Sequence, residues 1–358
     1  MTGTAVVVGA GVGGLATALG LRRAGWSVSV CERRAGPERY GTAFGIHPAA
    51  QAALDRLGVG EAVRARAVPY RNAQIRTPEG RVLANLPLER IERRAGRAEL
   101  MIPRPRLMDA LLDAVAAFGD VPVAYGAPVS CVRQLAAAND LVVGADGIGS
   151  TVRAACFGGR GAPRFIGTVA WIGIADFESG VYGETWGAGR FFGITPIEPG
   201  RTNWYATVPA ATTAEELRGY FDGWHDPIPR ILAGTDPSEW IRYEMRHLYP
   251  ALPAFVRGGR VALVGDAAHA MTPNLGQGAC TAILDAEALA RAVAALPPGG
   301  APGRGAPGPG GLSAALRAYD AERRRSAQRV AFASRWLHRF MTVRRTGPRD
   351  LLIGVLPW

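Results

Sequence analysis

The sequence predicts an α/β protein in which a unit of parallel strands and helices is interrupted by a region of mixed strands. Two observations indicate the parallel unit. An N-terminal strand runs through a glycine-rich turn into a helix, and two later hydrophobic strands end on turns that pair Gly with Asp. A third observation indicates the interruption, because the stretches around 73–86 and 164–210 carry the aromatic, β-prone pattern of strands. A long helix is expected near the C-terminus.

The composition is that of a folded globular chain, with 48% hydrophobic and 20% charged residues over 358 positions. All 41 basic residues are arginines and the formal charge is +11, but the arginines are scattered and no binding motif accompanies them. We therefore expect no nucleic-acid partner. No apolar run reaches the length of a bilayer, so we expect no stable membrane insertion and a cytoplasmic location. The four cysteines lack metal-ligand spacing, so no metal site is predicted.

The glycine-rich turn predicts binding of an adenine dinucleotide. Gly9 allows the tight turn, Gly11 lets the backbone approach a diphosphate, and Gly14 lets the helix pack closely on the strand. The next strand ends on Glu32, 18 residues after Gly14, where a carboxylate can accept a hydrogen bond from a ribose hydroxyl. For Arg33 a ribose or adenine contact and a solvated surface position both remain open.

The two Asp turns lie where an open α/β sheet binds its ligands. Asp146 follows a buried strand and precedes Gly147, while Asp266 follows Gly265 at the end of another strand. Ligands of such sheets sit beyond the carboxyl ends of the strands and use helix N-termini, and an apolar-faced helix begins near Gly278. Each turn alone fits an ordinary solvated Asp equally well. Together with the glycine turn, they indicate one extended ligand site.

The interruption predicts a discontinuous organisation. The first unit comprises 1–68, 101–157 and 252–296, and the sheet region comprises 69–100 and 158–251. A Gly/Pro-rich loop at 297–312 then leads to a C-terminal helical segment at 313–358. Aromatic side chains concentrate in the sheet region, so one of its faces is expected to wall an apolar cavity that accepts a ring.

These motifs together resemble the single-component FAD-dependent aromatic monooxygenases of the p-hydroxybenzoate hydroxylase superfamily, nearest to its salicylate- and 3-hydroxybenzoate-hydroxylase-like members. The resemblance spans nearly the whole chain and rests on VVVGAGVGGLATALGLRRAG, LVVGADGIGSTVR and RVALVGDAAHAMTPNLGQGA. It implies a Rossmann-like FAD-binding domain interrupted by a mixed-sheet substrate domain whose sheet roofs the flavin. It also implies FAD as cofactor, with NADPH or NADH as a transient co-substrate.

The resemblance assigns roles by position. The three glycines would hold the FAD diphosphate, Glu32 the adenosine ribose, and Asp266 the ribitol or diphosphate region. The implied cofactor-binding set is Gly9, Gly11, Gly14, Glu32, Arg33, Arg104, Asp146, Asp266, Gly276, Gln277 and Gly278. The implied catalytic positions are Pro273, Asn274, Gly276 and His47. For proton transfer no residue stands out, and His47, Tyr205 and Asn274 are the candidates.

The implied reaction inserts one oxygen atom into an aromatic or polyketide-like small molecule, by hydroxylation or epoxidation, as in secondary metabolism. NAD(P)H would reduce FAD, and dioxygen would form a flavin C4a-hydroperoxide that needs a dry pocket. The residues expected to line that pocket are Phe44, Trp171, Phe192, Trp204 and Met271. The partners are then a small aromatic substrate and dioxygen, and the chain is expected to be a monomer or a homodimer.

The chain also departs from the resembled pattern. Ile172 stands where many relatives have Arg, Leu284 replaces an acid, and 131–140 lacks a β-hairpin. Phe191 and Asn274 do not offer the Arg and Asp that urate hydroxylases use, which disfavours urate. The alternative is an FAD-binding protein of the same fold that inserts no oxygen. It would be a reductase, a cyclase or a redox-silent interaction protein.

Overall fold

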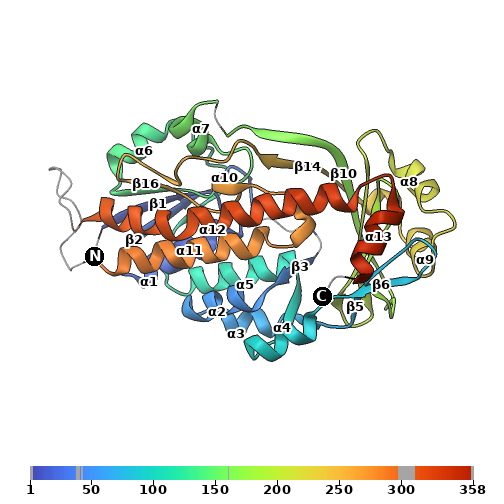
Figure 1. The fold of residues 1–358 in the computed structure, drawn as a ribbon. Coiled ribbons are helices and arrows are strands. Elements are labelled where there is room, and N and C mark those ends of the chain that lie inside the picture. The colour runs from blue at the N-terminus through green and yellow to red at the C-terminus, as the bar shows by residue number, and fades with distance from the viewer. Residues whose placement is uncertain (1–2, 38–40, 42, 160, 297–310, 356–358) are drawn as a thin grey trace.

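The computed structural model describes residues 3–37, 41, 43–159, 161–296 and 311–355. Its first layer is a six-stranded sheet in the order β15-β16-β9-β1-β2-β8 (Figure 1). Neighbours are parallel except the antiparallel edge pair of β15 and β16. The strands are β1 Thr4–Val8, β2 Ser27–Cys31, β8 Val123–Ala124, β9 Leu141–Gly144, β15 Val256–Arg257 and β16 Val261–Leu263. The central strands are short apolar runs, as expected for strands covered on both faces.

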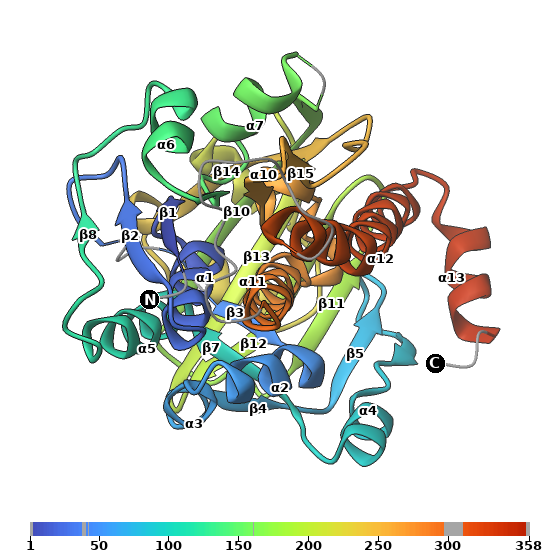
Figure 2. The ribbon, with the colours of Figure 1, turned by 90° about the vertical axis from the view of Figure 1, so that its left-hand side faces the viewer.

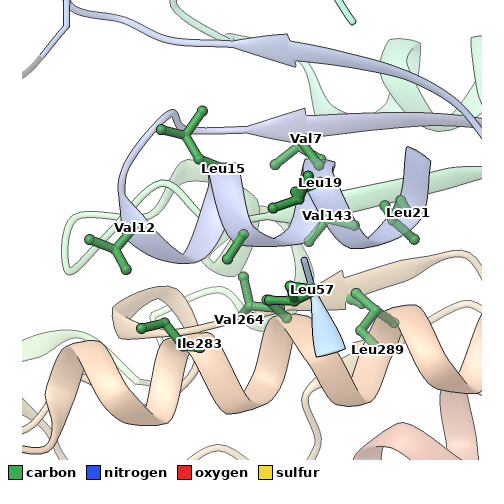
Figure 3. Packing of buried hydrophobic residues seen from close by; sticks show 14 of the residues in the cluster. Val7, Val12, Leu15, Leu19, Leu21, Leu57, Val143, Val264, Ile283 and Leu289 are labelled. Carbon is green, nitrogen blue, oxygen red and sulfur yellow. The ribbon is translucent and has the colours of Figure 1, made fainter. Parts of the chain in front are cut away.

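The helices α1 (Val12–Arg23) and α11 (Gly278–Ala294) pack against each other beside this sheet. Figure 3 shows Leu19 and Leu21 of α1 opposite Ile283 and Leu289 of α11. The approach is close, because a Cβ added at Gly20 would lie 2.6 Å from the Cβ of Ala290. The other helices of this layer are α2 Pro48–Arg56, α3 Gly60–Arg64, α5 Arg104–Ala116, α6 Val132–Ala138, α7 Thr151–Phe157 and α10 Asp266–His269. The segment 131–140, which from the sequence lacks a β-hairpin, is occupied by α6.

A seven-stranded sheet forms the second layer, in the order β14-β10-β13-β12-β11-β5-β6. Its strands are β5 Ala73–Arg76, β6 Val82–Asn85, β10 Pro163–Ala175, β11 Tyr182–Trp186, β12 Phe191–Glu198, β13 Arg201–Pro209 and β14 Ile241–Leu248. A small antiparallel sheet of β3 (Ala43–Ile46), β7 (Glu99–Pro103) and β4 (Val68–Tyr70) lies between the layers. The mixed-sheet interruption expected from the sequence is thus present.

The seven-stranded sheet has two different faces, because successive side chains of a strand point to opposite sides. On the outer face, Trp171, Phe192 and Trp204 pack with α8 (Ala214–Tyr220) and α9 (Ile228–Ala233). Figure 1 shows α8 and α9 at the far end of the molecule from the first sheet. The inner face carries Phe191 and Tyr205 instead.

The C-terminal helix α12 (Leu312–Met341) lies along α11 and crosses from one layer to the other (Figures 1 and 2). It is anchored rather than laid on the surface, because Tyr319 is fully buried and its hydroxyl donates to the Leu263 carbonyl at 2.7 Å. The last helix, α13 (Thr346–Val355), packs against β6. The remaining elements are α4 Leu88–Ala95, η1 Pro237–Glu239 and η2 Pro273–Leu275. Most of the loop expected at 297–312 lies outside the described residues.

Two further observations bear on the expectations from composition. The four cysteines are free in the structure. Among the described helices, none combines the length and the apolar character that a bilayer crossing requires.

Candidate cofactor and substrate site

The glycine turn is shaped by two close backbone approaches and one open position. Gly9 has φ +106°, and a Cβ there would lie 2.4 Å from the Ala145 carbonyl oxygen. A Cβ on Gly14 would lie 1.9 Å from the Gly9 carbonyl oxygen. A Cβ on Gly11 would meet nothing within 4 Å, although this residue caps the N-terminus of α1. Gly11 therefore leaves open space at a helix N-terminus, which is where a diphosphate binds.

Glu32 is fixed beside this turn. Its carboxylate accepts hydrogen bonds from the backbone N–H of Ala10 at 2.8 Å and of Arg34 at 2.9 Å. The side chain is 6% exposed, and a carboxylate has further lone pairs that a ribose hydroxyl can use. Arg33 is exposed, which fits the solvated alternative better than a buried adenine contact.

Asp146 holds the start of α7. Its carboxylate accepts from the Ser150 hydroxyl and from the backbone N–H groups of Thr151 and Val152, at 2.7 and 3.1 Å for the latter two. An acidic group at a helix N-terminus is favoured by the helix dipole. The structure gives Asp146 this capping role, and its contact with FAD stays a prediction.

Arg153 was not assigned a role from the sequence, yet it ties the two Asp turns together. It is 4% exposed, and its guanidinium donates to the carbonyls of Ile148, Asp266 and Ala267, the latter two at 3.4 and 3.2 Å. An Arg in the first turn of a helix opposes the helix dipole, so it needs such acceptors elsewhere. That unfavourable position was the only signal in the sequence.

Asp266 lies at the centre of a charged cluster between the two sheets. Burial raises the pKa of Asp266, while the positive charges of His269, Arg104 and Arg153 lower it. Tyr243 on β14 faces the same groups, and burial together with the Asp266 charge raises its pKa to about 12 against the effect of Arg104. The charges of Arg104 and Arg153 thus act on the Asp266 carboxylate, and guanidinium groups suit a phosphate while a carboxylate suits the hydroxyls of a ribitol. Sequence reasoning missed Tyr243, because it lies in no motif.

His269 is a packed residue. It is 3% exposed, and its Nε2 lies 2.5 Å from Asp285 Oδ2. Asp285 also accepts from Gly265 N at 3.0 Å and from Arg323 Nε at 2.9 Å. Burial alone would raise the pKa of Asp285, but His269, Arg323 and Gly265 outweigh it and lower the pKa. This ion-pair network holds the Asp266 turn onto α11 and α12.

The loop from Pro273 to Gly278 forms the open edge of the site. Gly276 has φ +63°, and a Cβ on Gly276 or Gly278 would meet nothing within 4 Å. Gln277 caps α11, so the positive end of that helix faces the loop. Asn274 donates from Nδ2 to the Met341 sulfur at 3.4 Å. Its buried Oδ1 has no hydrogen-bond partner within the described ranges.

His47 lies on the other side of this loop. Pairing of β3 with β7 places it beside Glu99, and its Nδ1 is 2.9 Å from Glu99 Oε2. Burial lowers the pKa of His47, but the Glu99 contact and the Leu275 carbonyl raise it by more. Its backbone N–H also approaches the Cys280 sulfur at 3.4 Å. The raised pKa therefore favours the protonated form of His47, which lies at the edge of the predicted flavin loop.

A row of paired residues crosses the inner face of the seven-stranded sheet. Glu184 pairs with Gly193, and Gly193 pairs with Tyr205. A Cβ on Gly193 would lie 2.0 Å from the Tyr205 ring, so the ring lies over this glycine. The Tyr205 hydroxyl then donates to Glu184 Oε1 at 2.7 Å, and Trp186 Nε1 donates to Glu184 Oε2 at 2.7 Å. Burial raises the pKa of Glu184.

The residues expected to line the substrate pocket divide between the two faces. Trp171, Phe192 and Trp204 are sealed beneath α8 and α9, on the side away from the Asp266 cluster, and this part of the expectation is corrected. Phe44 lies at the site, where the Arg104 guanidinium sits 5.1 Å from its ring centre. Met271 is 8% exposed and follows α10 directly. The alternation of side chains along the strands predicted two different faces. The helices α8 and α9 determine which of these faces is covered.

A glycine turn, a carboxylate at the end of β2 and a charged cluster at the ends of β9 and β16 define a protein that binds an adenine dinucleotide along this edge. The comparison with known proteins names the dinucleotide. Residues 2–334 match the family described as FAD binding domain, and the chain belongs to this family.

Curated relatives agree with this assignment. An aurachin C monooxygenase/isomerase of Stigmatella aurantiaca is 36% identical over 311 residues, which cover 80% of each chain. A FAD-dependent urate hydroxylase of Klebsiella pneumoniae is 30% identical over 311 residues, again 80% of each chain. Among solved structures, Klebsiella pneumoniae HpxO complexed with FAD and uric acid has a TM-score of 0.83 at 24% identity, covering 98% of this chain and 91% of that one. The last likeness concerns the fold.

The chain is therefore an FAD-dependent monooxygenase, an oxidoreductase for which NAD(P)H is the typical co-substrate. The fold, the cofactor and the enzyme class expected from the sequence are confirmed.

Proposed function

We propose that this monooxygenase inserts one oxygen atom into a small aromatic molecule held between the Pro273–Gly278 loop and the inner face of the seven-stranded sheet. The observation that carries the proposal is that two separate routes of contacts, one largely apolar and one polar, connect the loop to the sheet. A space bounded in this way places a ring next to the loop that the family resemblance assigns to the flavin.

The first route runs through α12. Asn274 on the loop contacts Met341 at the end of α12. Met341 is fully buried in a cluster that includes Phe191, with Tyr205 packed against it. The aromatic wall of the inner face is therefore continuous with the loop. It supplies an apolar, water-poor boundary, which oxygen transfer needs.

The second route runs through the small sheet. The Leu275 carbonyl raises the pKa of His47, and His47 Nδ1 lies 2.9 Å from Glu99 Oε2. Tyr70 on β4 pairs with Glu99 across the small sheet, and burial, followed by the charges of Glu184 and Glu99, raises the pKa of this phenol. Glu184 closes the route on the inner face of the sheet. Titratable groups thus extend from the loop through the small sheet to Glu184, which is hydrogen-bonded to Tyr205 and Trp186 of the aromatic wall.

The residues fit FAD by their own geometry. Gly11 leaves room for the diphosphate, Glu32 is held for the ribose, and Asp266 with Arg104 lies where the ribitol would pass. Bound FAD, once reduced by NAD(P)H, supplies the activation of dioxygen. The protein's part is to exclude water, to orient the ring against the sheet, and to exchange protons at His47. We assign Pro273, Asn274 and Gly276 to the oxygen-reacting edge of the loop and His47 to proton transfer.

Turnover tests this proposal. Purified holoenzyme should be yellow, and its NAD(P)H oxidation under air should rise several-fold with a phenolic substrate. Mass spectrometry should show products heavier by one oxygen atom, and a sample kept free of dioxygen should give none. NAD(P)H oxidation without an oxygenated product from any phenol would favour the reductase alternative. A colourless protein that fails to retain added FAD would remove the assignment altogether.

A further inference from the structure

The polar groups around the proposed substrate space are mainly hydrogen-bond acceptors, whereas a site that recognises a carboxylate offers donors and cations. Glu184 and Glu99 contribute two carboxylates, the Leu275 carbonyl is an acceptor, and the buried Asn274 Oδ1 has no donor within the described ranges. Among the described residues of this set, His47 is the one whose side chain can become cationic, and Glu99 already pairs with it. Hydrogen-bond acceptors are therefore in excess over donors in this set.

Three guanidinium groups of the described residues, those of Arg349, Arg76 and Arg104, are directed to other partners. Arg349 donates to the carbonyls of Trp186, Gly187 and Met341, so it lies behind the aromatic wall. Arg76 donates to Gln74 and to the Tyr182 carbonyl. Arg104 belongs to the Asp266 cluster on the cofactor side. These positions do not offer the bidentate pairing that a substrate carboxylate would need.

Glu184 has capacity for a further hydrogen bond. Each of its oxygens accepts one donor, from Tyr205 and from Trp186, whereas a carboxylate can accept about four. Tyr205 and Glu184 are both only partly buried, which leaves them accessible from the inner face. Ile172 extends the row beyond Tyr205 with an apolar side chain. The row therefore presents a fixed acceptor between apolar neighbours.

We infer that this pocket selects an uncharged aromatic ring bearing N–H or O–H donors, rejects aryl carboxylates, and uses Glu184 as its specificity-determining acceptor. The inference rests on the proposed function, because it describes the same site. Its physical basis is that a third carboxylate, brought beside Glu184 and Glu99, would be desolvated next to like charge, while His47, the cationic candidate among the described residues of the set, is already paired with Glu99. A donor-bearing ring would instead satisfy Asn274 Oδ1 and Glu184.

Three compounds of similar size separate these cases: salicylamide, which offers amide N–H donors; N,N-dimethylsalicylamide, which lacks them; and salicylate, which is anionic. Dissociation constants are measured from the change in flavin absorbance on titrating the FAD-loaded enzyme at pH 7.5. We expect salicylamide to bind roughly tenfold or more tightly than either of the other two, because buried acceptors left without a donor are costly. Salicylate binding as tightly as salicylamide would overturn the inference.

The variant Glu184→Gln tests the named residue. It keeps an oxygen for one of the two donors and removes the charge, so salicylate should bind more tightly than in the wild type while the preference for salicylamide shrinks. Glu244→Gln is the matched control, since Glu244 is an exposed acid on β14 of the same sheet, paired with Arg246. If the ratio of the dissociation constants of salicylamide and salicylate is unchanged in Glu184→Gln, another residue determines the selectivity. If Glu184→Gln does not fold, the wild-type comparison alone still decides between donor and carboxylate recognition.

The proposed function and the inference about substrate selection would be contradicted by different results. If salicylate is bound and hydroxylated in preference to salicylamide, the inference about acceptors is wrong and the monooxygenase proposal stands. If none of the three compounds perturbs the flavin and no phenol is oxygenated, the proposed function fails and the inference falls with it.

Discussion

Trp204 and Tyr205 are neighbours on β13, and they show how one strand can serve a core and a site at once. Each ring lies over a glycine of an adjacent strand: a Cβ on Gly173 would come 2.6 Å from Trp204, and one on Gly193 would come 2.0 Å from Tyr205. Trp204 points outward, stacks on Phe192 with ring centres 5.6 Å apart, and is fully buried. Tyr205 points inward and its hydroxyl binds Glu184. Both positions hold a large aromatic side chain. They differ in that Tyr205 has a polar partner in Glu184, whereas Trp204 packs against other aromatic rings.

This contrast predicts different losses on the two faces. Trp204→Ala should be the most destabilising of the changes considered, by about 3–5 kcal/mol in the free energy of unfolding, because it empties a sealed core position. Denaturant unfolding followed by circular dichroism measures this. A loss below about 1 kcal/mol would show that the outer face is less tightly packed than the structure indicates.

Tyr205→Phe should cost less stability and more function. The ring remains over Gly193, but Glu184 loses one of its two donors, which corresponds to about 1–2 kcal/mol in the free energy of unfolding. Turnover with the best phenol should fall by a larger factor than this cost explains. Steady-state kinetics and unfolding are compared on the same preparation, and unchanged kcat/KM would place Tyr205 outside the site.

The pH dependence of stability tests the role of His47, which lies on the other side of the proposed substrate space from Tyr205. The contact with Glu99 raises the pKa of His47 above its ordinary value despite burial, so the folded state binds the proton more tightly than the unfolded state. Its stabilisation is therefore fully present below the ordinary pKa of about 6.5 and is lost as pH rises through the folded pKa. The difference in unfolding free energy between wild type and His47→Gln should shrink on going from pH 5.5 to pH 9. A difference that grows with pH would mean that His47 is neutral in the fold.

The smallest effect is expected for an aromatic residue without either role. Phe332 on α12 is 59% exposed, and Phe332→Ala should change the free energy of unfolding by no more than about 0.5 kcal/mol. Binding of salicylamide should stay the same in this variant. A larger change would reveal that the exposed side of α12 contributes to the fold or the site.

The parts predictable from the sequence were those in which a local pattern has one physical meaning. Gly14 must lack a side chain because the Gly9 carbonyl is in the way, and Asp266 ends a buried strand at the ligand-binding edge. The face that we propose to bind substrate was not predictable in this manner. Alternation marks two faces equally, and the choice depends on α8 and α9 docking over Trp204, which the strand itself does not encode.

Glu184 and Tyr243 escaped prediction because their partners are distant in the chain. Tyr205 reaches Glu184 across two strand pairings, and Tyr243 meets Asp266 only when the two sheets come together. Asn274 and His47 were named from the resemblance, but their unpaired or shared atoms appear only in three dimensions. Their roles in oxygen insertion and proton transfer stay predictions.

The bridge made by Arg153 has a consequence for how the enzyme gains and loses its cofactor. One guanidinium clamps a carbonyl next to Asp146 and two carbonyls at Asp266, positions more than 110 residues apart in sequence. Neither turn can swing away without breaking bonds to the other. We therefore expect the ends of β9 and β16 to move together, so that a ligand bound at either turn also restrains the other.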